Sequence, residues 1–210
     1  MTNNFCIRTK SGFTSRAGLF LAGSIAAVVS LTGNAEPSKG PVEPLVVNGC
    51  KLWPYARCPG ADLRHADLSA RDLAGADFTG ANLSRADLRV ANLAGAILDG
   101  ADLTAAKLQK VNAPGASFRN AKLVGADLEF ARLMRSDLSG ADLTAANLEM
   151  ARFNFAWLEG ARLTNANLQE TKFVTTNLRR ANLEGALFKY TIFPDSSFEG
   201  CTGCPDPALW

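Results

Sequence analysis

The chain has 210 residues, of which 47% are hydrophobic and 20% are charged, with 22 Lys and Arg against 20 Asp and Glu. These proportions are those of a folded globular chain and argue against an intrinsically disordered one. The near balance of charge argues against both a strongly basic nucleic-acid-binding surface and an acidic mimic of DNA.

Residues 1–35 have the layout of a secretory signal peptide. Three basic residues precede an apolar run at residues 17–31, and small residues then lead to Ala35. An uncleaved membrane anchor is disfavoured, because about 15 apolar residues fall short of the roughly 20 that a spanning helix needs. The arginines are not adjacent, so this is not a twin-arginine signal. We expect cleavage after Ala35 and export to the periplasm, to the outside of the cell or to an equivalent lumen.

Removal of this segment would change the inventory of charges and cysteines. It takes three of the 22 basic residues and none of the 20 acidic ones, so the mature chain is close to neutral. It also takes Cys6 and leaves four of the five cysteines. An even number of cysteines in an exported chain is typical of disulfide bonds.

Two short segments follow. Residues 36–47 contain three prolines and are predicted to be a linker. Residues 48–60 are predicted to be an N-terminal cap, because Trp53 and Cys58 already keep the phase of the repeat that begins at Ala61.

A period of five residues runs without a slip from Ala61 to Gly200. The central residue of each unit, position i, is Leu or Phe in every unit except at Ala113, and position i−2 is most often Ala. Period five fits neither an amphipathic helix nor an alternating strand. The chain must therefore turn in every unit, and the frequent glycine at i+2, as at Gly75 and Gly80, permits that turn.

The tandem A(D/N)LxG units of residues 61–200 resemble those of the pentapeptide-repeat family. The resemblance implies an all-β fold, a right-handed quadrilateral parallel β-helix with four units per coil and about seven coils in this solenoid. It also implies that positions i and i−2 point inward while i−1, i+1 and i+2 face solvent. At Ala113 the larger Val111 at i−2 should conserve volume, and Arg71, charged at i−2, should reach solvent on the first coil.

Residues 201–210 break the phase and are predicted to be a C-terminal cap, in which Phe193, Phe198 and Trp210 close the apolar end. In the family's geometry the two ends lie about seven coils apart, whereas a disulfide needs Cα atoms within roughly 7 Å. We therefore expect the pairs Cys50–Cys58 and Cys201–Cys204. The same separation excludes a shared four-cysteine metal site, and a redox or metal role for the C-terminal C-x-x-C is a weaker alternative to a structural disulfide.

The sequence lacks the residue combinations of an enzyme. His65 is the only histidine, and the recurring Asp residues of the first coil are distributed over four faces. No glycine motif for phosphate or dinucleotide binding occurs. We expect no catalytic residues, no cofactor and no metal.

One surface feature suggests a binding site. On the third face, counting that of Leu63 as the first, and at its two corners, large apolar residues alternate with arginines in the fourth to sixth coils. The set is Phe130, Arg132, Met134, Arg135, Met150, Arg152, Phe155, Trp157 and Val174. Aromatic, Met and Arg residues together are typical of the centre of a protein interface. The alternative is that they only stabilise neighbouring coils.

These features predict an exported, non-enzymatic scaffold that binds an unknown protein or envelope partner and no nucleic acid. One alternative comes from the resemblance: some pentapeptide-repeat proteins mimic DNA and bind DNA gyrase, which the neutral charge and the export signal argue against. The other alternative is peripheral binding to the cell envelope. A homodimer could also form through the C-terminal end.

Overall fold

The computed structural model of the protein describes residues 44–206. By their contacts, residues 1–41 and residues 42–210 are separate units, and the described residues belong to the second. The predicted signal peptide, most of the predicted linker, and Trp210 of the predicted C-terminal cap lie outside the described residues. Within residues 44–206, no helix has the length and hydropathy needed to cross a membrane.

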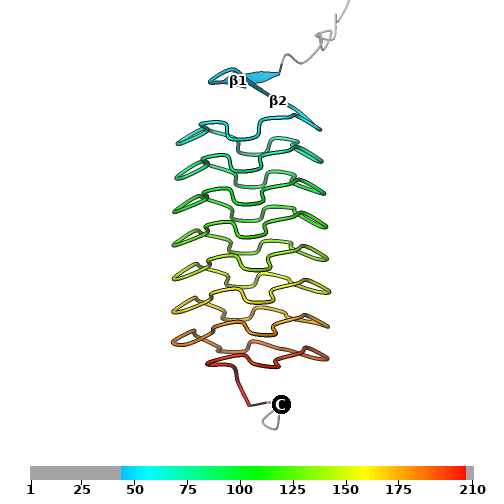
Figure 1. Ribbon diagram of the computed structural model, residues 1–210, viewed down its shortest axis with the longest axis vertical. Helices are drawn as coiled ribbons and strands as arrows, with labels where there is room; N and C mark the ends of the chain where they lie inside the picture. Colours follow the sequence, from blue (N-terminus) through cyan, green and yellow to red (C-terminus); the bar gives the residue numbers. More distant parts are fainter. Residues whose placement is uncertain (1–43, 207–210) are drawn as a thin grey trace, which may run out of the picture. The chain divides into compact units, whose positions relative to one another are not determined.

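A two-stranded hairpin precedes the repeat (Figure 1). Strand β1 spans Leu45–Val47, strand β2 spans Cys50–Leu52, and the two pair antiparallel. The turn residues Asn48 and Gly49 have positive φ angles of 47° and 82°, as an Asn-Gly hairpin turn requires. The prediction that the linker extends to residue 47 is therefore wrong for its last three residues, because this turn folds them back onto β2.

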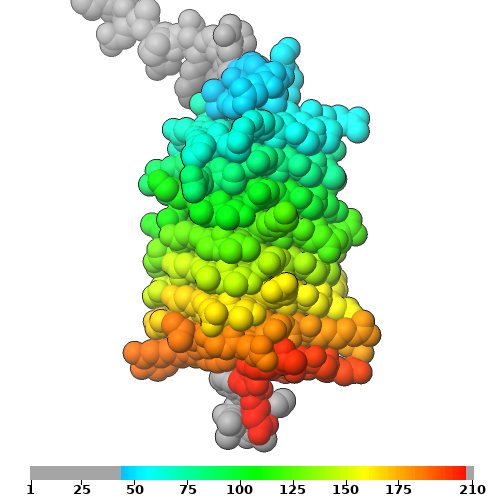
Figure 2. Space-filling model, turned by 60° about the vertical axis from the view of Figure 1, so that its left-hand side comes forward, coloured from blue at the N-terminus to red at the C-terminus, as the bar shows by residue number. Residues whose placement is uncertain are grey.

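From Arg57 onward the chain winds into stacked coils, which appear as level layers of colour in the space-filling view (Figures 1 and 2). Parallel bridges join residues 20 apart, from Arg57 with Asp77 to Asn182 with Thr202. Four units of five residues therefore make one coil, and the bridging residue is position i−1. Because the backbone of each coil pairs with the coils before and after it, the fold is a parallel β-helix.

The interior is filled by positions i and i−2. From Leu63 to Leu183, the residue at i has an exposed fraction of 1% or less in every unit. Val111 and Ala113 are both buried, so the larger residue at i−2 fills the space left by the smaller one at i. Arg71 is exposed on the first coil, as the cost of burying a charge requires.

Phenylalanines fill the core toward the C-terminal end. Phe153, Phe173 and Phe193 stack in one column, with ring centroids 5.1 Å and 5.0 Å apart. Phe198 packs edge-on against Phe193 at 5.3 Å. The last coils therefore have a core of interlocked rings where the earlier coils mostly use leucine.

Every corner of a coil is made by a residue at i+2 in the left-handed region. Gly80 has a φ of 64°, but Val90 and Phe130 adopt nearly the same angle, at 60° and 58°. For a residue other than glycine this conformation costs roughly 1–2 kcal/mol. The corners without glycine are therefore places where a side chain is kept despite strain.

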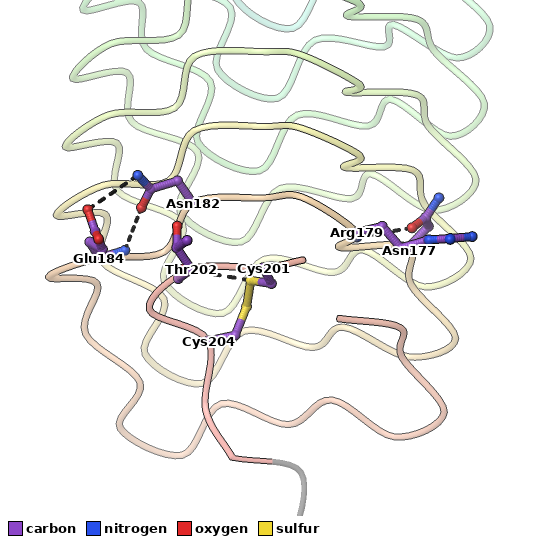
Figure 3. The surroundings of a disulfide bond; sticks show 7 residues. All are labelled: Asn177, Arg179, Asn182, Glu184, Cys201, Thr202 and Cys204. Carbon is purple, nitrogen blue, oxygen red and sulfur yellow. Dashed lines mark hydrogen bonds between the residues drawn. A yellow bond between two sulfur atoms is a disulfide. The ribbon is translucent and has the colours of Figure 1, made fainter. Parts of the chain in front are cut away.

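The four cysteines of the described residues form one pair near each end of the coil stack. The Cα atoms are 5.7 Å apart in Cys50–Cys58 and 5.9 Å apart in Cys201–Cys204, and Figure 3 shows the second disulfide. Gly203, inside the second pair, has a φ of 66°, and a Cβ there would lie 2.5 Å from the backbone nitrogen of Glu184. This loop therefore packs directly on the backbone of the preceding coil.

Candidate interaction surface

Because the coils stack, residues 20 apart form columns along the sides of the β-helix. The third face consists of residues 71–75 and the corresponding units of each later coil. It is bounded by two corners, one shared with the second face and one shared with the fourth. The surface residues predicted from the sequence lie on this face and at these corners.

Position i−1 usually has a structural role. In the described coils the backbone N–H of position i+1 has no backbone acceptor, and an Asp or Asn at i−1 accepts it. Asp142 Oδ1, for example, accepts the N–H of Thr144 at 3.0 Å. On the third face, Asp72 and Asn92 do the same, and the Asn92 amide donates to Asp72 Oδ1 at 2.8 Å. This bonding explains why Asp and Asn recur at i−1.

From the fourth to the sixth coil, the i−1 column of the third face carries cations in place of Asp and Asn. Arg132, Arg152 and Lys172 occupy three successive coils, each bridged to the next. Their side chains are exposed, and none forms an ion pair within residues 44–206. Like charges side by side repel, and cations cannot accept the N–H of i+1. On the first face, by contrast, Lys122 lies between two Asp residues.

These cations line a groove of about 600 Å³ at the corner between the second and third faces. The opposite wall is the corner column, in which Lys110 Nζ lies 5.8 Å from the ring centroid of Phe130. The lining carries four cations and one carboxylate, and we call it the cationic groove. Its residues are Val90, Lys110, Asn112, Phe130, Arg132, Met150, Arg152, Glu170 and Lys172.

A second groove of about 350 Å³ lies at the corner between the third and fourth faces. We call it the aromatic groove, because Phe155 and Trp157 are its large side chains, and they are 51% and 49% exposed. The remaining lining residues are Arg135, Ala156, Thr175 and Asn177.

The structure divides the surface predicted from the sequence into two sites. The cationic groove contains Phe130, Arg132, Met150 and Arg152, and the aromatic groove contains Arg135, Phe155 and Trp157. Met134 and Val174 are half-buried in the column between the grooves and line neither.

Sequence reasoning missed the charged residues that complete the cationic groove. Lys172 is the next residue after Arg152 in a column of period 20, so extending that column by one coil would have found it. Lys110 and Glu170 lie in the corner column of Phe130, and the same register would have found them.

Several carboxylates outside the grooves accept hydrogen bonds from residues of their own coil. A side-chain hydrogen bond from Arg64 holds the pKa of Asp62 at about 2. Hydrogen bonds from Ser69 and Thr79 likewise lower the pKa values of Asp67 and Asp77. Groups held ionised in this way are suited to supporting the backbone and the surface charge, and not to donating or accepting protons at neutral pH.

Metal-binding side chains are not clustered in the described coils. Among residues 44–206, no group of three or more His, Cys, Asp or Glu side chains could hold a metal ion. His65 is exposed at a corner, with a φ of 59°. The surface presents positive charge at one corner and aromatic area at the other.

The family model described as "Pentapeptide repeats" matches the chain with eight copies over overlapping segments within residues 72–202. The structure of HetL, a pentapeptide repeat protein involved in heterocyst differentiation regulation in the cyanobacterium Nostoc sp. strain PCC 7120, is 30% identical in sequence. That match covers 69% of this chain and 86% of HetL, with a TM-score of 0.33. No curated protein matches the chain.

Two other solved structures are similar to the chain. A pentapeptide repeat protein from the Arabidopsis thaliana thylakoid lumen is 29% identical, over 60% of this chain and 71% of its own, with a TM-score of 0.21. A trypsin-treated form of QnrB1, a plasmid-mediated fluoroquinolone resistance protein, is 20% identical, over 70% of this chain and 79% of its own, with a TM-score of 0.40.

Proposed function

Because the chain belongs to the pentapeptide-repeat family, we propose that it is a non-enzymatic scaffold that binds a partner protein through the aromatic groove. The scaffold is a right-handed β-helix of about seven coils. The observation that carries the proposal is the pair of half-exposed aromatic residues, Phe155 and Trp157, beside Arg135. Aromatic and Arg side chains in a shared depression are the residues that most often dominate protein-binding energy.

Both aromatic residues stand where the repeat favours a different residue. Trp157 occupies position i−1, directly beside Asp137 of the preceding coil, and it cannot accept the N–H of position i+1 as Asp does. Phe155 is a corner residue with a φ of 60°, whereas the first coils of its column have glycines such as Gly75 and Gly95. The scaffold would be better served by Asp and Gly, so a binding role accounts for the aromatic residues.

The test replaces both aromatics, as Phe155→Ser with Trp157→Thr. We expect the double variant to lose its partner in cross-linking and affinity capture from the native compartment, with little change in thermal midpoint because both side chains are half exposed. Ile97→Ser is the matched control, since Ile97 is 40% exposed in the same column as Trp157. Partner capture that survives the double change, or a large loss of stability, would assign both aromatics to the scaffold.

Export and oxidation are the second part of the proposal. The cysteine pairs near the two ends suit an oxidising compartment. Intact mass of the protein recovered from its native compartment, with and without reduction, tests this part. We expect a chain that begins at Glu36 and gains about four mass units on reduction of two disulfides. A full-length, reduced chain would contradict export and make binding to DNA gyrase the next activity to test.

A further inference from the structure

We propose that two copies of this chain associate side by side through the corner between the second and third faces. The acidic side of the corner in one copy lies against the cationic groove of the other. The inference goes beyond the proposed partner binding, which uses the aromatic groove at the opposite edge of the third face.

The corner carries a continuous ridge of side chains. Its residues are Ala70, Val90, Lys110, Phe130, Met150, Glu170 and Tyr190, and all have positive φ. The corner after the fourth face is instead mostly glycine, as at Gly80, Gly100, Gly140 and Gly160. Val90 is 59% and Phe130 40% exposed, so burial within one copy does not offset the strain. Burial against a second copy would.

The two sides of the ridge carry opposite charges in two successive coils. The pairs are Glu129 with Arg132 in the fourth coil and Glu149 with Arg152 in the fifth. In the sixth coil, Glu170 lies on the ridge itself, beside Lys172. None of these six residues forms an ion pair within residues 44–206. Glu149 Oε2 accepts a hydrogen bond of 3.2 Å from Asn167. The chain therefore presents both halves of a charge-complementary surface and pairs neither half with the other.

A two-fold axis at the corner, parallel to the axis of the β-helix, would bring the second face of one copy to the third face of the other, twice. Such a contact is self-complementary, which is what a symmetric dimer requires. Because both copies have the same spacing between coils, the charges of the fourth and fifth coils match at the same time. With this axis each coil faces the same coil of the other copy, so Glu149 lies opposite Arg152 twice.

A second copy fits this corner better than an acidic polymer or peptide does. An acidic ligand would match Arg132 and Arg152 but would be repelled by Glu129 and Glu149 on the other side of the ridge. A peptide strand would find few backbone groups to pair with, because coil-to-coil hydrogen bonds use them on this side of the β-helix. Only a partner with both signs of charge in the same order satisfies both sides.

The size of the contact sets the expected affinity. From Val90 to Lys172 the cationic groove crosses five coils, which amounts to four spacings of adjacent strands or roughly 19 Å. That length places the contact toward the small end of specific interfaces, so we expect a dissociation constant in the micromolar range, on the order of 1–100 µM. Because exposed ion pairs flank the contact, dissociation should increase with salt.

The test reverses the charges of Glu149 and Arg152 and measures mass by sedimentation velocity or light scattering across the micromolar range. We expect Arg152→Glu alone and Glu149→Arg alone each to weaken the dimer at least about tenfold, since each puts like charges opposite each other twice. An equimolar mixture of the two variants should form a heterodimer, and the double variant should dimerise with itself. Arg162→Glu, an exposed reversal on the first face of the next coil, should change nothing.

Four results would overturn the proposal. The first is a wild-type chain that stays monomeric at all concentrations and low salt. The second is a dimer that Arg152→Glu leaves intact, which would move the contact elsewhere, for example to the C-terminal end. The third is an equimolar mixture of the two single variants that forms no heterodimer. The fourth is a monomer whose binding to polyglutamate is lost in Arg152→Glu, which would make the groove a site for an acidic ligand. None of these results bears on Phe155 and Trp157, so partner binding can fail or succeed independently.

Discussion

Replacing Phe173 with Ala should destabilise the last coils more than the same change in the middle of the β-helix. Phe173 is fully buried and stacks on Phe153 at 5.1 Å and on Phe193 at 5.0 Å. Phe118 is 1% exposed and has no ring contact within residues 44–206. Truncating a buried Phe costs about 3–5 kcal/mol. Each stacked pair adds about 0.5–1.5 kcal/mol, so Phe173→Ala should cost about 1–3 kcal/mol more than Phe118→Ala.

Two measurements check the difference. Urea unfolding followed by circular dichroism compares the free energies of the two variants, and amide hydrogen exchange locates the loss. Because each coil contacts only its neighbours, exchange should accelerate mainly in the coils around the substitution. Equal losses in the two variants would refute a contribution from stacking. Faster exchange spread evenly over all coils would refute the coil-by-coil account of stability.

Three further predictions concern the backbone and the surface charge. Gly203→Ala should destabilise the C-terminal loop by about 1–3 kcal/mol, because its Cβ would lie 2.5 Å from the backbone nitrogen of Glu184. The readout is faster amide hydrogen exchange confined to that loop, and an unchanged exchange rate would contradict the close packing. Val90→Gly should be neutral or stabilise by up to about 1 kcal/mol in urea, because it relieves a strained corner at the cost of chain entropy; a clear loss would show that the exposed side chain is needed. The third prediction is for acid stability. Since the pKa of Asp62 is about 2 in the folded chain and thus below its unfolded value, the stability it contributes is complete above about pH 4 and lost as the pH falls toward 2. Asp62→Asn should flatten this part of the curve of urea midpoint against pH, and an unaltered curve would place the acid sensitivity elsewhere.

The repeat could be read from the sequence because its period leaves a residue-level signature. Because a Leu or Phe recurs at every fifth residue, residues 20 apart lie in register on adjacent coils. On the first face, for example, Asp62 bridges Asn82. The exchange of volume between Val111 and Ala113 was also predictable, because close packing is local to one layer.

The hairpin and the grooves were less predictable. The Asn48–Gly49 turn was present in the sequence, but the upstream prolines favoured a linker. The grooves depend on which side chains meet around a corner, so a face-by-face reading joined Arg132 and Phe155 in one surface that the structure divides in two. The sequence shows that Asp and Asn recur at i−1, and the structure identifies the N–H of i+1 as the group that they bind.

The hydrogen bonds between coils also determine how the protein would respond to a pulling force. They join residues 19 to 21 apart along the chain, as from Leu63 to Asn82 and from Asp77 to Ala56, and point from one coil to the next. Tension applied at the two ends would load one layer of bonds at a time. Each coil of 20 residues that peels away would release roughly 65 Å of extended chain. Both disulfides close short loops, 8 and 3 residues long, so neither would stop the unravelling. The protein would therefore lengthen in equal steps, one coil at a time.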